Sequence, residues 1–432
     1  MHSLDDLRAG RLLGVTRLDL SAQLRHFPSE IFALADSLEV LNLTGNQLTE
    51  LPADLHRLHR LKVLFCSDNL FTELPEAVGA CAQLETVGFK SNRICQVSAN
   101  ALPAALRALI LTDNLIETLP ETLGQCQHLQ KLMLAGNRLT ALPESLQQCQ
   151  RLELLRIASN RLTALPGWLL QLPRLAWLAY ADNPLPRGFQ PPHQAAACAR
   201  IEWSALTLEG ELGRGASGVI HAARWTAQAA PVAVKVYKGA ITSDGSPQAE
   251  MTACLAAGDH PHLVQVAGRV DDHPEQLPAL VMQRIPAQWH NLAGPPTLDS
   301  CTRDHYGPGP RLTLPALLRL AEGIASVAAH LHGRGINHGD LYGHNILFQE
   351  ASGQCLLGDF GAASFYPPGG ALQALEVRAF GILLQELLTL GAHAHGPLHV
   401  MAERCVQPAV ALRPCFADLA AELHQRLTAS AH

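Results

Sequence analysis

The sequence of 432 residues is long enough for two or three domains. It is 48% hydrophobic and 16% charged, so it can bury a sizeable core and is not an intrinsically disordered chain. The net charge is −6 and no run of Lys and Arg occurs, which argues against nucleic-acid binding. Only five of the 32 basic residues are lysine, so the position of each lysine is informative.

Leader, membrane and cysteine patterns favour a cytoplasmic protein. Residues 1–10 contain no apolar run, so we expect no secretory signal. The most apolar stretches, 168–181 and 380–392, are short and interrupted by polar residues or proline, so we expect no membrane span. The 11 cysteines are odd in number and form no C-x-x-C pair, which disfavours disulfides or a zinc site.

Asparagines divide the first half of the sequence into repeats of 22 or 23 residues: Asn46, Asn69, Asn92, Asn114, Asn137, Asn160 and Asn183. Each closes a version of L-x-x-L-x-L-x-x-N, and a degenerate earlier copy ends at Gln23. The L-x-L alternation puts leucines on one face of a short strand, and the asparagine amide can satisfy buried backbone groups at the turn. Leu-Pro follows most copies and starts a return segment. Because one copy cannot bury its own leucines, the copies must stack.

This pattern resembles the leucine-rich repeat family over residues 11–190. The resemblance implies an α/β solenoid of about eight repeats, with a concave surface formed by the other strand residues. Several of these are unusually apolar for exposed positions: Val63, Phe65, Ile110, Met133, Leu154, Arg156 and Trp177. Two interpretations stay open, a binding surface for a protein partner or substrate, and a surface covered by another part of the same chain.

Prolines and glycine break the repeat after Asn183. We interpret residues 191–203, which include an Ala-rich connector at 195–199, as a linker. The second domain is expected at residues 204–430.

A glycine-rich segment opens the second domain. Gly213, Gly215 and Gly218, followed by Val219, are similar to G-x-G-x-x-G-x-V, which alone is a weak signal. A strand-like Val-Ala-Val run then ends in Lys235, one of only two lysines after residue 190.

Three further motifs follow in order. Glu250 lies 15 residues after the strand lysine, in a segment with a helical pattern. A His-Gly-Asp sequence ends at Asp340 and is followed by Asn345, and Asp-Phe-Gly begins at Asp359. The complete ordered set resembles the protein kinase family, which implies an α+β bilobal domain.

The resemblance implies ATP and Mg²⁺ as cofactors. Backbone N–H groups of the glycine loop would approach the phosphates, and Lys235, oriented by Glu250, would hold them. Val219 would also contact the bound cofactor, Met282 would be the gatekeeper, and Ile285 would lie in the hinge at 283–285.

The same resemblance implies the catalytic roles. Asn345 and Asp359 would bind Mg²⁺, and Asp340 would accept the proton of the substrate hydroxyl. His338 and Phe360 would be packing residues of the catalytic core.

The second domain departs from the family pattern in several ways. Gly339 stands where an arginine is common, and Tyr342 replaces a common lysine. Only 17 positions separate Asp359 from Glu376, which stands at a usual aspartate position, and no A-P-E occurs. We therefore expect a shortened activation segment and an Arg413 without its usual glutamate partner.

An apparent insertion at residues 291–311 contains Cys301, Asp304 and His305. We expect an irregular surface loop there rather than a metal site.

The layout resembles bacterial cytoplasmic leucine-rich repeat kinases. We expect an ATP-dependent protein kinase acting on Ser or Thr in signal transduction, with the repeats selecting a protein partner or substrate and with no nucleic acid or membrane partner. A small-molecule phosphotransferase of the aminoglycoside or choline kinase type also fits the His-Gly-Asp motif and the missing A-P-E. A pseudokinase scaffold is the third alternative. Tyr342 in place of the lysine leaves open whether Ser, Thr or Tyr is the acceptor, and the sequence also leaves the oligomeric state open.

Overall fold

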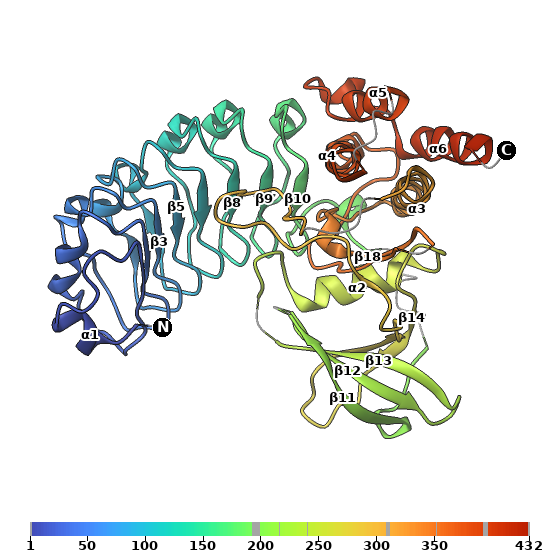
Figure 1. Ribbon diagram of the computed structural model, residues 1–432, viewed down its shortest axis with the longest axis horizontal. Helices are drawn as coiled ribbons and strands as arrows, with labels where there is room; N and C mark the ends of the chain where they lie inside the picture. Colours follow the sequence, from blue (N-terminus) through green and yellow to red (C-terminus); the bar gives the residue numbers. More distant parts are fainter. Residues whose placement is uncertain are drawn as a thin grey trace. The chain divides into compact units, whose positions relative to one another are not determined.

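Short parallel strands recur once per repeat in the first part of the molecule (Figure 1). The computed structural model describes residues 2–191, 199–215, 217–239, 241–307, 312–350, 352–391 and 396–430. The chain divides into two compact units, the repeat unit Met1–Leu172 and the second unit Pro173–His432, and each is described by itself.

The strands of the repeat unit form a parallel ladder. They are β1 (Arg17–Asp19), β2 (Val40–Asn42), β3 (Val63–Phe65), β5 (Thr86–Gly88), β7 (Ala108–Ile110), β8 (Lys131–Met133) and β9 (Leu154–Arg156). The middle residues are in register from repeat to repeat and fully buried: Leu18, Leu41, Leu64, Val87, Leu109, Leu132 and Leu155. The predicted stacking of L-x-L strands is confirmed.

Return segments of the repeats are short 3-10 helices. They are η1 (Ser29–Leu34), η2 (Leu55–Arg57), η3 (Glu76–Val78), η4 (Ala99–Ala101), η5 (Glu121–Gln125), η6 (Glu144–Gln148) and η7 (Gly167–Gln171). Most begin directly after a proline, because that position needs no backbone N–H donor. Helix α1 (Leu4–Arg8) precedes the first strand, and two-residue strands β4 (Glu73–Leu74) and β6 (Gln96–Val97) form a small parallel pair.

The repeat asparagines bridge neighbouring turns. Asn137 accepts a hydrogen bond from the N–H of Ile116 at 3.1 Å. Its amide nitrogen donates to the carbonyls of Leu111 and Leu134 at 2.9 and 3.0 Å. Asparagines of other repeats make the same hydrogen bonds to neighbouring turns. Each amide satisfies backbone groups that water cannot reach, so the predicted role of the repeat asparagines is confirmed.

Cysteines of the repeat unit behave as small apolar residues. Cys81, Cys126 and Cys149 are buried, and burial raises the pKa of their thiols to about 11, 11 and 12. All ten cysteines in the described ranges are free, so reduced thiols contribute to this core by packing.

The predicted concave row is less exposed than expected. Val63, Met133, Leu154 and Arg156 are buried, while Phe65 and Ile110 are half-buried. The row therefore offers little free apolar surface.

The second unit begins with the last repeat. This repeat contains strand β10 (Trp177–Ala179) and the turn η8 (Arg187–Phe189). The packing boundary after Leu172 thus lies inside the predicted repeat region 11–190. Residues 192–198, which include most of the predicted connector at 195–199, lie outside the described residues.

An antiparallel sheet follows in the order β11-β12-β13-β15-β14. Its strands are β11 (Leu206–Arg214), β12 (Gly218–Trp225), β13 (Ala230–Tyr237), β14 (Val266–Val270) and β15 (Ala279–Gln283), preceded by the turn η10 (Trp203–Ala205). Helix α2 (Pro247–Ala257) begins at Ser246, whose hydroxyl accepts a hydrogen bond from the N–H of Ala249 at 3.0 Å.

Helices dominate the remainder of the second unit. They are α3 (Leu314–Gly333), α4 (Gln373–Gly391), α5 (Gly396–Cys405) and α6 (Phe416–Ser430), with the turns η11 (Gly343–Asn345) and η12 (Val410–Leu412). Short strands complete this part: β16 (His290–Asn291), β17 (Ile336–Asn337), β18 (Ile346–Gln349), β19 (Gln354–Leu357) and β20 (Ser364–Phe365). A sheet portion followed by a helical portion confirms the predicted bilobal α+β architecture.

Helix α3 is long and apolar enough to cross a membrane by length and composition. Most of it is buried, and it packs against α4 and α6, so its apolar face serves the core of the second unit.

Replacing Asn137 with Ala should lower the free energy of unfolding of the repeat unit by about 3 kcal/mol, since several buried backbone groups lose their partner. Chemical denaturation measures the change. The control is Asn100→Ala, because Asn100 is exposed and bonds only weakly to Glu76 at 3.3 Å. Equal losses in the two variants would contradict the structural role of the ladder.

Candidate functional site

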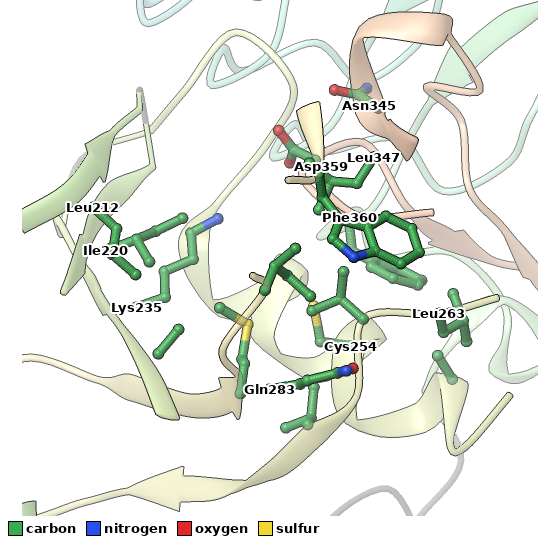
Figure 2. Close-up of a pocket in the computed structure, with 18 of the residues that line it drawn as sticks. Leu212, Ile220, Lys235, Cys254, Leu263, Gln283, Asn345, Leu347, Asp359 and Phe360 are labelled. Atoms are coloured by element: carbon green, nitrogen blue, oxygen red, sulfur yellow. The ribbon is translucent and has the colours of Figure 1, made fainter. Parts of the chain in front are cut away.

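A pocket of about 490 Å³ lies in the second unit, with side chains from the antiparallel sheet, α2 and the segments before and after β18 along its walls. Figure 2 shows Lys235 reaching toward the side of the pocket where Asp359 and Asn345 lie. The apolar walls include Ile220, Met282 and other aliphatic side chains. A pocket with convergent polar groups at one end and apolar walls elsewhere is suited to a ligand with a flat apolar part and a charged part.

Lys235 and Glu250 form an ion pair inside the pocket. The alternation of β13 directs Lys235 into the pocket, and helix α2 places Glu250 opposite it. Burial alone would lower the pKa of Lys235, but the charges of Glu250 and Asp359 outweigh burial and raise it. Lys235 therefore carries a fixed positive charge where little water is present.

The glycine loop joins β11 to β12. Gly213, Gly215 and Gly218 lie at this turn, and Gly218 passes so close to β13 that an added Cβ would meet the carbonyl of Val236 at 2.4 Å. The placement of Val219 in the pocket is wrong. Val219 lines a separate depression on the other face of the sheet, and the next residue, Ile220, lines the pocket, because side chains alternate along a strand.

The end of β15 supplies the rear wall of the pocket. Met282, Gln283 and Ile285 all line it, as the gatekeeper and hinge assignments require. Met282 lies opposite Ala233 of β13 in the sheet register, so the strand pairing fixes its position.

The segment between β17 and β18 carries Asp340 and Asn345. The amide nitrogen of Asn345 donates to a carboxylate oxygen of Asp340 at 2.7 Å and to its backbone carbonyl at 2.9 Å. This pair of bonds fixes the orientation of the Asp340 carboxylate and leaves the amide oxygen of Asn345 on the opposite side of its side chain.

Glu376 of α4 holds the start of this segment from inside the core. Its carboxylate is 1% exposed and accepts hydrogen bonds from the N–H of Gly339 at 2.7 Å and of His338 at 3.2 Å. His332 Nε2 donates to the same carboxylate at 2.7 Å. Burial would raise the pKa of Glu376, but the hydrogen bonds that its carboxylate accepts from His332 and from the N–H of Gly339 lower it below its ordinary value. Glu376 therefore stands at the position expected from the sequence, and it is a buried anion there.

Asp359 adopts a strained backbone conformation with φ of 55°. Its carboxylate accepts a hydrogen bond from the N–H of Gly361 at 3.1 Å. The ring of Phe360 packs 5.1 Å from the ring of His338, and His338 Nε2 bonds the carbonyl of Gly358 at 2.9 Å. The expected packing roles of His338 and Phe360 are thus met.

Asn345 and Asp359 offer an amide oxygen and a carboxylate at the same end of the pocket (Figure 2). Hard oxygen ligands of this type are those that Mg²⁺ prefers, so the residues present fit this ion.

The segment 291–311 differs from the expected surface loop. Within its described part, Thr302 and Asp304 are buried, and the carboxylate of Asp304 bonds His344 Nδ1 at 2.6 Å and the N–H of His344 at 3.0 Å. The other ring nitrogen of His344 lies 4.0 Å from Asp340. The segment thus braces the Asp340 loop. Sequence reasoning missed this role, because 40 residues separate the two partners.

In the described ranges, no group of three or more His, Cys, Asp or Glu is arranged to hold a metal ion. Residues 308–311 of the segment lie outside those ranges.

Arg413 has partners of a different kind from the expected glutamate. Its guanidinium donates to the backbone carbonyls of Gln407, Ala374 and Pro173 at 2.9, 3.0 and 2.9 Å. Burial lowers the pKa of Arg413 to about 10.

Comparison with known families agrees with this arrangement. The family model described as "Protein tyrosine and serine/threonine kinase" matches residues 206–368, and two leucine-rich repeat models match residues 127–185 and 37–58. The chain therefore contains leucine-rich repeats followed by a protein kinase domain.

Individual relatives cover only parts of the chain. The serine/threonine-protein kinase PkaA of Streptomyces coelicolor is 30% identical over 225 residues, 43% of this chain and 39% of that protein. The proto-oncogene serine/threonine-protein kinase mos of Sus scrofa is 28% identical over 192 residues, 41% of this chain and 52% of that protein. A solved leucine-rich repeat protein of Leptospira interrogans is 33% identical, covers 40% of this chain and 50% of its own, and has a TM-score of 0.35. The chain thus spans about half or less of each of these relatives.

Replacing Glu376 with Gln should lower the free energy of unfolding of the second unit by about 3 kcal/mol at pH 7, because an amide cannot replace the anion among these donors. A group whose folded pKa is depressed stabilises the fold above its unfolded pKa, near 4.5, and loses that contribution as pH falls through the folded value. The difference between the two proteins should therefore shrink only in acid.

Urea denaturation between pH 7 and pH 3.5 checks this expectation, with Glu403→Gln on the exposed face of α5 as the control. A difference that stays constant over this range would contradict the role of a buried carboxylate anion.

Proposed function

We propose that this protein is an ATP-dependent protein kinase that phosphorylates serine or threonine and uses its repeats to bind a protein partner or substrate. The observation that carries the proposal is the buried Lys235–Glu250 ion pair, which shares one pocket with Asp359 and Asn345. The match to a protein kinase model over residues 206–368 and the names of the two kinase relatives support the reaction class and the acceptor.

The pocket offers different surroundings to the base and to the phosphates of the nucleotide. Ile220, Met282 and Ile285 form apolar walls for a flat base, and Lys235 presents its charge to the phosphates. Glu250 keeps the lysine extended toward that end of the pocket, so the cation is in place before the nucleotide arrives.

Asp340 is the residue proposed to accept the proton of the acceptor hydroxyl. Asn345 orients its carboxylate through the 2.7 Å bond, and Glu376 fixes the backbone just before it. Mg²⁺, held by Asn345 and Asp359, would offset the negative charge that develops on the transferred phosphoryl group. Positioning and electrostatics are the main contributions that the protein makes to this reaction.

The repeats support a protein partner because stacked repeats form a long surface suited to macromolecules. On the predicted concave row, Phe65 and Ile110 keep partial exposure and are the residues through which we expect contact. Free cysteines throughout the described ranges support a cytoplasmic location.

Incubation of the purified protein with labelled ATP and Mg²⁺ tests the proposal. Label should pass to a generic protein substrate or to the chain itself, and Asp340→Asn or Asp359→Asn should reduce the rate by about 100-fold or more, since each loses a charge at the reacting groups.

Amino sugars and choline serve as competing acceptors in the same assay. Transfer to these alone would identify a small-molecule phosphotransferase. Absence of ATP binding would identify a pseudokinase scaffold, and either result would overturn the proposed function.

Lys235→Met should weaken binding of Mg²⁺–ATP by roughly 10- to 100-fold, since one charge-assisted hydrogen bond to phosphate is lost. Titration calorimetry measures the affinity. Lys90→Met is the control, because Lys90 belongs to the repeat unit and does not line the pocket. Similar affinities of the two variants would contradict the role given to Lys235.

A further inference from the structure

The last repeat packs directly on the catalytic loop of its own unit. The indole ring of Trp177 stacks on the ring of Tyr342 with centroids 4.2 Å apart and an angle of 8°. The indole N–H donates to the carbonyl of Leu341 at 3.1 Å, and Trp177 is 1% exposed. Of the two interpretations of the predicted concave row, cover by the same chain therefore holds at this position.

The residues just before Asp340 also contact this repeat. The amide nitrogen of Asn337 donates to the carbonyl of Leu178 at 3.2 Å. A Cβ atom on Gly339 would lie 2.8 Å from the carbonyl of Leu178 and 2.5 Å from that of Ala362, and Gly339 has φ of +72°. Any larger residue, including the arginine common in the family, would displace the repeat.

Two further contacts join this repeat to the segment after Asp-Phe-Gly and to the start of α2. The N–H of Tyr180 donates to the hydroxyl of Ser364 at 3.0 Å, and Ser364, in the segment after Asp-Phe-Gly, is fully buried. The hydroxyl of Ser246 bonds the carboxylate of Asp182 and also caps α2, the helix that carries Glu250. One repeat therefore contacts the catalytic loop, the segment after Asp359 and the start of α2.

Two arginines of the helical portion complete the attachment. Arg413 donates to the carbonyl of Pro173, and Arg378 donates to that of Arg174 at 3.2 Å. The repeat thus uses the arginine that stands where the family pairs it with a glutamate of the activation segment.

We propose that the last repeat, residues 173–183, takes the place of the shortened activation segment and holds the catalytic loop and α2 in their working arrangement. Trp177 and Tyr342 are the positioning residues, since they act on Asp340 through the backbone that follows it. The inference rests on the proposed kinase function, and it makes residues 173–183 a structural part of the catalytic machinery.

These contacts explain how the last repeat can position the catalytic loop without phosphorylation of the segment after Asp359. Asp340 lies between Gly339, whose N–H is bound by Glu376, and Leu341, whose carbonyl is bound by Trp177. With both neighbours fixed, the carboxylate keeps its position, and displacement of a catalytic group by about 1 Å can cost roughly 100-fold in rate.

Trp177→Ala in the full chain tests the proposal. It should lower kcat by about 100-fold while the Kd for Mg²⁺–ATP stays within about threefold, because the nucleotide pocket keeps its own lining. Trp168→Ala is the matched control, since Trp168 is a buried tryptophan of the preceding repeat, 6% exposed, and should leave kcat within about twofold. A kcat in Trp177→Ala as high as in the control would overturn the proposal.

Trp177→Phe keeps the test decisive if the alanine variant fails to fold. It retains a ring over Tyr342 and removes the N–H bond to Leu341, so kcat should fall by about fivefold. Unchanged kcat in this variant would count against the proposal.

Hydrogen exchange of residues 336–346, followed by mass spectrometry, separates the two proposals. Exchange in this segment should accelerate in Trp177→Ala and stay unchanged in Trp168→Ala, whether or not the wild type transfers phosphate. Inactive wild-type protein with accelerated exchange in the variant would refute the kinase function and keep the positioning role. Unchanged exchange would refute the positioning role.

Discussion

The buried carboxylate of Glu376 is the constraint on which the catalytic loop depends. A charge with 1% exposure is stable in the core only if nearly all of its acceptor capacity is used. The N–H groups of His338 and Gly339 and the ring of His332 meet this need. The buried carboxylate also constrains its donors, because each of them must stay within hydrogen-bond distance of it. The backbone that leads into Asp340 is therefore fixed.

Three departures of the second domain from the family pattern share one structural feature, which is contact with the last repeat. The arginine replaced by Gly339, the lysine replaced by Tyr342 and the missing partner of Arg413 look in the sequence like three separate losses. In the structure the repeat fills all three places, with the Leu178 carbonyl against Gly339, Trp177 on Tyr342 and the Pro173 carbonyl at Arg413. The three departures therefore meet the same packed repeat.

Strong motifs and periodic patterns made much of the fold and site predictable. Seven asparagines at nearly constant spacing indicated the ladder of repeats, and Lys235, Asp340 and Asp359 stand in the pocket or the loop that the motifs implied. The error at Val219 is a shift of one residue, and on a strand such a shift moves a side chain to the other face. Ile220, two positions after the last glycine of the loop, is the residue that the motif should have indicated.

Long-range contacts could not be predicted in the same way. The bond between Asp304 and His344 spans 40 residues, and the bond between Trp177 and Leu341 spans 164. Neither has a local pattern, because each depends on how separate elements pack. The apolar row of the repeats was compatible with a partner-binding surface or with cover by the same chain, and the sequence alone did not identify what covers Trp177.

A double-mutant cycle between Trp177→Phe and Glu376→Gln tests the central claim, that the last repeat and the buried glutamate hold the same loop from two sides. The free energy of unfolding of the second unit is measured by denaturation for the wild type, both single variants and the double variant. We expect a coupling energy of about 1 kcal/mol or more, because residues that share one network do not act independently. Additive losses, within about 0.4 kcal/mol, would contradict it.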